Sequence, residues 1–415
     1  MNSYATTYKQ WNNPNQNTFL PEERISLFFT AVWILYILLS PVYIFSKGLP
    51  QPADYLLFFC GFPALFVAMI RHRGGLSKVF LFGMLFAVLT LAINLIHFSF
   101  LQNDRLLKHS IYYIFNFSAF YYTLIMFKQS PETMNRLIYI AVAASIVFQF
   151  IYAPLFGTVE LFRNTGTFNN PNQLAYWCIL SACILIVIKR DQPFTLLDLA
   201  LFAMLFYLQS LSLSKAGLIV SALLLPIIVF LPNMPNFGKI LALIGILAFI
   251  ITQVIDPQTL GQKLTQVEQL SAVADRINNI GTESDDSASG RGYDRIIKYP
   301  HYILYGAGEG AFSRFGVGAQ EIHSGLGTLL FSYGISGFIF FLMFVYAVFY
   351  RVPRQYYLLL GLVFLFGIPH QNIRFTYFWV FLGIVYSHRI YFEDREKHMA
   401  RLKEITNIKN NNFKK

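Results

Sequence analysis

The sequence predicts an all-α protein that crosses a lipid bilayer about twelve times, and three observations support this fold class. Hydrophobic residues make up 55% of the 415 residues, and charged residues make up only 13%, roughly half the fraction of an average soluble domain. Apolar runs of roughly 20 residues, the length that a spanning helix needs, recur between Ile25 and Phe392. The runs are continuous rather than alternating, so the sequence favours helices over the strands of a membrane barrel.

The apolar runs place the spanning helices along one membrane-embedded domain that covers residues 1–415. We expect helices at 25–46, 53–70, 76–100, 110–127, 136–156, 174–189, 194–212, 215–231, 239–255, 324–350, 355–373 and 376–392. A polar segment, 1–24, precedes the first helix, and a basic tail, 393–415, follows the last one. The longest connection, 256–323, lies between the ninth and tenth helices.

The distribution of lysine and arginine predicts which side of the membrane each connection faces. With the N-terminus in the cytoplasm, the cytoplasmic segments contain 20 of the 32 lysine and arginine residues. Because cytoplasmic loops carry the excess of positive charge, we expect both termini in the cytoplasm and residues 256–323 outside. The net charge of +11 is therefore a topology signal, and the sequence shows no compact basic fold of the kind that binds nucleic acids.

The long outer connection contains helical patterns and a glycine-rich turn. Apolar residues at helical spacing predict one amphipathic helix at 258–280 and a shorter, partly polar one at 291–299, which Pro300 ends. The cluster of three glycines in Gly306–Gly310 predicts a tight turn, and it lacks the preceding strand and following Lys-Ser/Thr pair of a nucleotide-binding loop. We expect the connection to fold over the outer ends of the helices as a lid.

Polar side chains in the predicted helices gather toward the outer side. They are Asn94, His97, Asn116, Gln149, Gln209 and Gln253. Such groups are costly in a bilayer, and their one-sided distribution favours a polar cavity that opens outward, with interhelical hydrogen bonding as the alternative. The cysteines, which are Cys60, Cys178 and Cys183, all lie inside apolar runs, which favours buried thiols over a disulfide framework or a metal site.

Four patches on the predicted outer side carry a resemblance to a known family. They are RNTGTFNNPNQLA (Arg163–Ala175), LSLSKAG (Leu211–Gly217), SGRGYDRIIKYPHYILYGAGEGAF (Ser289–Phe312) and HSGLGTLLFSYGISG (His323–Gly337). In their order, their spacing and their position around the long connection, the chain resembles the superfamily of O-antigen polymerases and O-antigen ligases. Among these it looks most like the Wzy-type polysaccharide polymerases. One departure is Lys215, which stands where the family usually has arginine.

The resemblance implies a glycosyltransferase of the bacterial inner membrane with cytoplasmic termini, a periplasmic active site, and no metal or other cofactor. Its donor would be a glycan on undecaprenyl diphosphate, and its acceptor another glycan at the same bilayer. A polymerase joins repeat units of O-antigen, capsule or exopolysaccharide, and a chain-length regulator is a candidate partner. An O-antigen ligase and a protein O-oligosaccharyltransferase are alternatives with the same donor. A flippase for lipid-linked glycans is less favoured, because no internal repeat is visible.

The donor's diphosphate requires cations near the membrane surface, and the acceptor hydroxyl requires a base. Arginine binds phosphate bidentately and lysine acts as a point charge, so we expect Arg291, Lys215 and Arg163 to bind the diphosphate. Arg291 is also expected to act in catalysis, since it would stabilise the charge of the leaving group. His323 is the expected base, because the family motif centres on it and imidazole titrates near neutral pH. We expect Lys215, Arg291 and His323 to converge in one outward-facing site.

Other polar residues of the same patches are candidates for supporting roles. Glu309 and Glu321 are alternative bases. Asn169 and Asn172 can bond sugar hydroxyls, although the Asn-Pro step between them is also typical of a plain turn into a helix. Arg295 is a candidate for support of the site, although an amphipathic lid helix carries exposed charges in any case.

Overall fold

The computed structural model describes residues 27–46, 48–63, 77–160, 163–240, 290–316 and 321–393. Over these residues the chain is mostly helical, and one antiparallel pair of two-residue strands, β1 (Val159–Glu160) and β2 (Arg163–Asn164), is the only sheet that they form. The predicted all-α class is confirmed. The segment 1–24, the helix at 258–280, nearly all of the span 239–255 and the tail beyond residue 393 lie outside the described residues.

The helices follow the predicted apolar runs. They are α2 (Leu27–Leu39), α3 (Pro52–Leu56) with the π-helical turn η1 (Leu57–Gly61), α5 (Lys78–Leu101), α6 (Arg105–Gln129), α7 (Pro131–Phe156), α8 (Pro171–Ile188), α9 (Leu196–Ser212), α10 (Lys215–Val229), α16 (Gly325–Phe349), α17 (Arg354–Gly367) and a helix over 376–393. The described residues of the long connection, 290–316 and 321–323, are called the lid below. They contain the short helices α14 (Asp294–Lys298) and α15 (Tyr302–Tyr305) and the 3₁₀ turn η3 (Phe312–Phe315).

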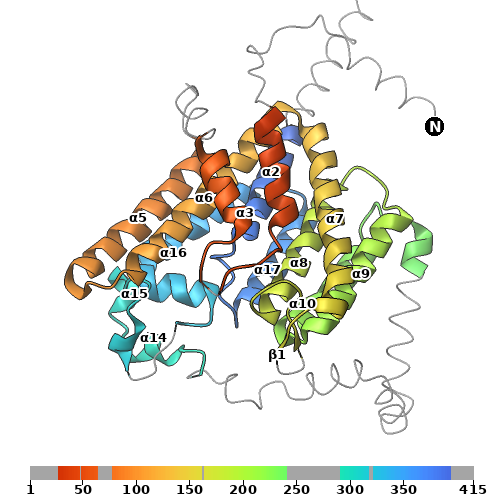
Figure 1. Cartoon of the computed structure of the whole chain (residues 1–415). Helices are drawn as coiled ribbons and strands as arrows, with labels where there is room; N and C mark the ends of the chain where they lie inside the picture. Colours follow the sequence, from red (N-terminus) through yellow and green to blue (C-terminus); the bar gives the residue numbers. More distant parts are fainter. Residues whose placement is uncertain are drawn as a thin grey trace, which may run out of the picture.

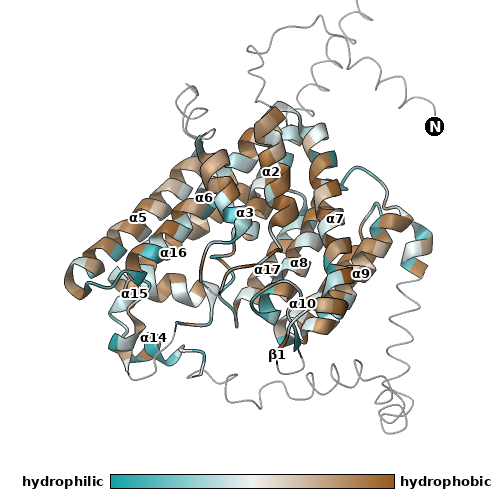
Figure 2. Ribbon diagram, in the orientation of Figure 1, coloured by the Kyte–Doolittle hydropathy of each residue, from teal (hydrophilic) through white to brown (hydrophobic). Residues whose placement is uncertain are grey.

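Four of the described helices, α5, α7, α8 and α16, are long and apolar enough to cross a membrane, and α2, α9, α10 and α17 are shorter apolar helices. Their surroundings differ: α8 is enclosed by other helices, whereas α5 and α7 leave more than half of their apolar windows uncovered. Figure 2 shows brown, hydrophobic residues over much of the length of α5 and α7. Large exposed apolar faces on several helices are typical of a membrane protein.

The helices pack as an oblique bundle in which neighbours in space are often distant in sequence (Figure 1). α16 packs against α5 and α15, α10 packs against α17, and α2 packs against α7. In Figure 1 the lid helices α14 and α15 lie at the same lower end of the bundle as β1. The segments that carry the four sequence patches therefore gather toward one end of the molecule.

Side-chain caps fix the starts of the helices that border this end. The Ser214 hydroxyl accepts a hydrogen bond from the Gly217 amide at the start of α10, and the Ser324 hydroxyl accepts one from the Gly327 amide at the start of α16. Asn170 caps α8 in the same way. Each cap satisfies one of the free amides of a first turn and so sets where the helix begins.

The predicted span 355–373 is too long, because α17 ends at Gly367. Residues 368–374 form a loop instead. Pro369 has no amide hydrogen to continue a helix, and the Asn372 side-chain amide folds back to donate to the Val363 carbonyl of α17 at 3.0 Å. This loop, called the platform loop below, lies beside the lid and carries Arg374.

Four of the polar side chains that we expected around an outward cavity, those of Asn94, Asn116, Gln149 and Gln209, are buried, and His97 is half-buried. Three of the buried ones connect different parts of the chain. The Asn94 side-chain amide donates to Ser110 at 2.8 Å, and that of Asn116 donates to the Arg374 carbonyl at 3.0 Å. Gln149 donates to the Pro41 carbonyl at 3.2 Å. These contacts match the alternative of hydrogen bonding between elements. Gln253 lies outside the described residues.

A break in α16 creates the seat for the glycine-rich turn. Gly334 has φ 66° and ψ −175° inside the helix, so the carbonyls before it lose their helical partners. The Ala307 amide donates to the Phe331 carbonyl at 2.9 Å, and the Gly308 amide donates to the Ser332 carbonyl at 2.8 Å. The turn thus replaces the missing helical hydrogen bonds, and it comes so close that a Cβ on Gly334 would lie 2.7 Å from the Leu304 carbonyl oxygen.

We expect Gly334→Ala to destabilise the protein by about 1–3 kcal/mol, because alanine resists the positive φ and its methyl group would strike the Leu304 carbonyl. Thermal unfolding in detergent measures the effect. Gly361→Ala is the matched control, since a Cβ there meets no atom within 4 Å and alanine favours the helix. Equal unfolding temperatures for the two variants would contradict this account of the break.

Candidate functional site

The glycine-rich turn places one carboxylate, that of Glu309, entirely inside the protein. Its side chain has no solvent exposure. The hydroxyls of Tyr113 and Tyr333 both donate to Oε2, at 3.0 and 2.9 Å, and the Glu309 backbone amide donates to Asn94 Oδ1 at 2.8 Å. Helices α5, α6 and α16 therefore hold this residue from three sides.

The platform loop supplies the cation for this carboxylate. Arg374 Nη1 lies 3.4 Å from Glu309 Oε1, and Arg374 Nη2 lies 2.5 Å from Glu321 Oε2. Burial alone would lower the pKa of Arg374, but Glu321 and Glu309 outweigh it and raise this pKa. Burial likewise opposes ionisation of Glu321, and the nearby Arg374 guanidinium more than compensates, so that the Glu321 pKa is lowered. Arg374 and Glu321 are therefore both charged near pH 7.

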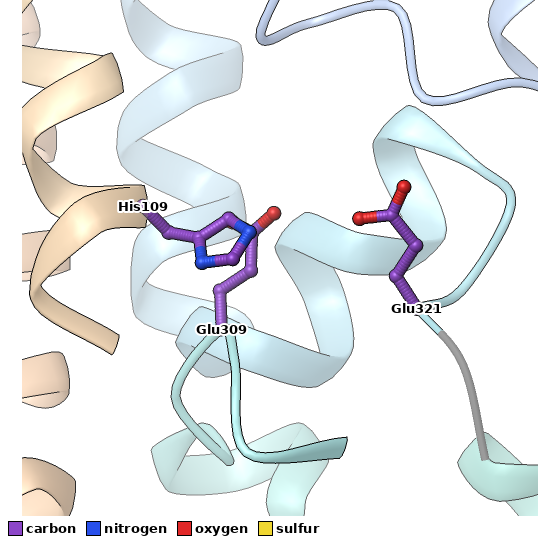
Figure 3. A group of neighbouring side chains, drawn as sticks. All are labelled: His109, Glu309 and Glu321. Carbon is purple, nitrogen blue, oxygen red and sulfur yellow. The ribbon is translucent and has the colours of Figure 1, made fainter. Parts of the chain in front are cut away.

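His109 faces the same carboxylates from α6 (Figure 3). Its Nδ1 lies 2.6 Å from the Arg105 carbonyl oxygen, which can only accept, so Nδ1 carries the hydrogen and Nε2 keeps a lone pair. Single ligand atoms of His109, Glu309 and Glu321 all lie within 4.8 Å of one another. A metal ion would find three suitable ligands here, but it would have to displace Arg374, whose guanidinium already contacts both carboxylates.

His323 and Arg291 lie side by side next to this charged group. The His323 amide donates to the Arg291 carbonyl at 3.0 Å, and Arg291 Nη1 donates to the Pro369 carbonyl at 2.6 Å. Burial lowers the pKa of the His323 imidazole; Glu321 opposes that shift, and three nearby arginines, which are Arg291, Arg295 and Arg374, add to it. The imidazole is therefore neutral at pH 7 and can accept a proton.

Arg295 and Arg314 have different surroundings in the lid. Arg295 is 7% exposed, and its guanidinium lies 5.8 Å from the centre of the Phe315 ring. Its Nη1 is buried and meets no hydrogen-bond acceptor among the described residues. Burial lowers the pKa of Arg295, which indicates the cost of holding this cation out of water. Arg314, by contrast, donates to the carbonyls of Ala307 and Gly308 and braces the glycine-rich turn.

A second group of predicted residues lies around the start of α10. Arg163 Nη2 donates to Asn172 Oδ1 at 2.7 Å, and Arg163 Nε donates to the Ser212 carbonyl at 3.2 Å, three residues before Lys215. Lys215 is the first residue of α10. The Asn169 side-chain amide instead donates to the Phe45 carbonyl at 2.9 Å, so it serves the structure of the loop.

The two groups belong to neighbouring elements. α10 packs against α17, which leads directly into the platform loop. The Asn372 side-chain amide of that loop donates to the Tyr176 hydroxyl of α8 at 3.3 Å. The structure thus brings together Arg291, His323, Glu321 and Glu309, and separately Arg163 and Asn172 beside the turn before Lys215. Direct convergence of Lys215 with Arg291 and His323 stays a prediction.

Sequence reasoning missed the residues that organise the first group: His109, Tyr113, Tyr333 and above all Arg374. A sequence signal existed for Arg374, which is the only charged residue between the last two predicted spans. A lone cation in so short an apolar connection is compatible with a buried anionic partner, but the sequence does not identify that partner. For the tyrosines and His109 no comparable signal exists, because their roles depend on which helices meet.

We expect Tyr113→Phe to destabilise the protein by about 1.5–3 kcal/mol, because a buried carboxylate loses one of its donors. Unfolding in detergent as a function of temperature measures the loss. Tyr112→Phe, one residue away, is the control: its hydroxyl donates to the Gly48 carbonyl at the surface, at 2.9 Å, and should contribute little. If both variants unfold alike, Glu309 does not depend on its tyrosine donors.

Comparison with known proteins assigns the chain to no family. No protein-family model matches it, and no curated protein matches it. The function proposed below is therefore drawn from the chain's own motifs and from the contacts of the site residues.

Proposed function

We propose that the chain is a polytopic glycosyltransferase of the bacterial inner membrane, with about twelve spans, cytoplasmic termini and a periplasmic site. It joins glycan repeat units that are linked to undecaprenyl diphosphate. The observation that carries this proposal is the pairing of His323 with Arg291 through their backbones at 3.0 Å. The backbones of two separate motifs meet there, and the Arg291 charge is near enough to lower the pKa of the His323 imidazole. Transfer from a diphosphate to a hydroxyl requires such a base and such a cation in one site.

Arg291 is proposed to bind the donor's diphosphate. Its hydrogen bond to the Pro369 carbonyl fixes the orientation of the guanidinium, which suits a planar, two-point contact with phosphate oxygens. Lys215 and Arg163, at the start of α10, are proposed to bind further phosphate oxygens from the neighbouring elements. Asn172, which holds Arg163, and Arg295, which lies near His323, would support this binding.

His323 is proposed to accept the proton of the acceptor hydroxyl. As that oxygen forms its bond to the anomeric carbon of the donor, the bond from this carbon to the phosphate oxygen breaks, and the diphosphate leaves on its lipid with the electron pair. The cations stabilise the departing charge, so no metal is needed in the proposed reaction. Glu309 and Glu321 are weaker candidates for the base, because both are paired with Arg374.

Replacement of the two central residues tests this assignment. We expect His323→Ala and Arg291→Ala each to lower chain growth from lipid-diphosphate-linked repeat units by on the order of 100-fold or more, since each removes a group that acts on the reacting atoms. Purified protein in detergent or liposomes, supplied with such units, gives the measurement.

The control for both variants is Lys298→Gln, which removes an exposed lid charge paired with Asp294 at 2.6 Å. It should retain wild-type turnover. Near-normal chain growth in both His323→Ala and Arg291→Ala, with unfolding temperatures equal to that of the wild type, would exclude these residues from the transfer step.

A strain that lacks the chain distinguishes the polymerase from its alternatives. We expect surface glycans that end after a single repeat unit, because a polymerase extends the glycan before it is attached elsewhere. A bare lipid A core with full-length glycan trapped on the lipid carrier would instead indicate a ligase. Glycan analysis by gel and mass spectrometry reads out both. Translocation without any bond formation by liposomes of the purified protein would indicate a flippase.

A further inference from the structure

The platform loop, residues 368–374, receives contacts from several described residues of the lid and from the start of α16. Arg291 and Tyr293 donate to the carbonyls of Pro369 and Ile368, and the Gly325 amide donates to the His370 carbonyl at 3.0 Å. Arg374 ends the loop with its two ion pairs. The segments before and after His323 therefore rest on one short connection that none of the four sequence patches includes.

We propose that Arg374 is a positioning residue for the transfer site: by bridging Glu309 and Glu321, its guanidinium fixes His323 in place against Arg291. This inference rests on the proposed function and deepens it.

The bridge has one rigid end and one adjustable end. Glu309 is wholly buried and held by two tyrosine hydroxyls and by its own amide, so it cannot follow a displaced partner. Glu321 is partly exposed, with 31% of its side-chain surface accessible, and it lies two residues before His323. A guanidinium held by the first carboxylate therefore dictates where the second one lies. The position of His323 follows from that of Glu321, because only Ile322 separates them.

Lysine cannot replace arginine in this role. The guanidinium presents separate nitrogens to the two carboxylates, Nη1 to Glu309 and Nη2 to Glu321. A planar fork can hold two anions at a set angle, whereas an ammonium is a point charge on a flexible stem. Arg374→Lys should therefore keep the charge and lose much of the geometry.

The same bridge has an electrostatic consequence that tests it. The charged groups that face His323 are Glu321, which raises its pKa, and Arg291, Arg295 and Arg374, which lower it. Removing Arg374 takes away one cation and leaves the Glu321 carboxylate unpaired, so the pKa of His323 should rise. Removing the carboxylate of Glu321 should lower the pKa of His323. A residue that only stabilises the fold would not give opposite shifts.

The experiment compares Arg374→Gln, Arg374→Lys and Glu321→Gln with Lys298→Gln in chain growth from lipid-diphosphate-linked repeat units. We expect kcat to fall by on the order of 10- to 100-fold in Arg374→Gln and by less in Arg374→Lys, since small displacements of a reacting group have effects of this size. The acid limb of the pH profile should move to higher pH in Arg374→Gln and to lower pH in Glu321→Gln. Lys298→Gln should match the wild type.

Hydrogen exchange of the amides of residues 321–325 gives a readout that does not require activity. Faster exchange in Arg374→Gln than in Lys298→Gln is expected, because the His323 amide would be less firmly held against the Arg291 carbonyl. If Arg374→Gln does not fold, Arg374→Lys and Glu321→Gln carry the same comparisons.

The outcomes separate this inference from the function on which it rests. If the wild type transfers glycan, and the Arg374 and Glu321 variants match Lys298→Gln in rate and pH profile, the positioning role is overturned and the proposed function is not. No transfer by the folded wild type overturns the proposed function, and unchanged exchange at 321–325 in Arg374→Gln would then overturn the positioning role as well. Shifts of the acid limb in the same direction in Arg374→Gln and Glu321→Gln would also contradict the positioning role.

Discussion

A buried carboxylate paired with one partly buried cation, the pair of Glu309 and Arg374, is the constraint on which this end of the molecule depends. An ionised group without solvent is tolerated only when its oxygens are satisfied by donors and its charge by a partner. Glu309 meets this requirement with two tyrosines from the bundle and one arginine from the platform loop. Three parts of the chain that are far apart in sequence must therefore assemble together, since none of them can satisfy the charge alone.

In the proposed site, one part of the chain supplies rigid support and another supplies the groups proposed to react. The bundle helices supply the donors that hold Glu309, and the lid supplies Arg291 and His323, whose backbones are bonded to each other. The platform loop connects the two. Its Pro369 carbonyl accepts a hydrogen bond from Arg291 of the lid, and its Arg374 forms an ion pair with the buried Glu309 carboxylate. In arrangements of this kind, packing and ion pairs behind the reactive groups fix their positions before a substrate binds.

Much of the fold could be predicted from the sequence, because a continuous apolar run of the right length has few alternatives to a helix. The runs at 76–100 and 324–350 became α5 and α16 within a few residues. The early end of α17 was missed, since its apolar run continues past the point where Pro369 stops the helix. Local pattern also could not reveal the break at Gly334, whose carbonyls matter only once the glycine-rich turn docks on them.

The residues of the candidate site also fall into those that local sequence identifies and those that only the fold identifies. Arg291 and His323 could be singled out from the sequence, because each lies in a motif with its own signature, and their proximity is seen in the backbone contact between them. Their roles stay a prediction. Arg374 could not be assigned a role, since its partners are 53 residues or more away along the chain, and a charge in a short loop has many possible fates. The tautomer of His109 likewise depends on a carbonyl one helical turn away and on carboxylates from the lid.

The docking of the glycine-rich turn on α16 limits which segments could be exchanged between related proteins. Main-chain groups of the lid complete the hydrogen bonding of a helix that lies in apolar surroundings, where unpaired carbonyls would be costly. The lid is therefore part of the backbone hydrogen-bonding network of the bundle, and it cannot be exchanged independently of α16. Chimeras that exchange the lid between related chains should keep the broken helix and its lid as one inherited unit.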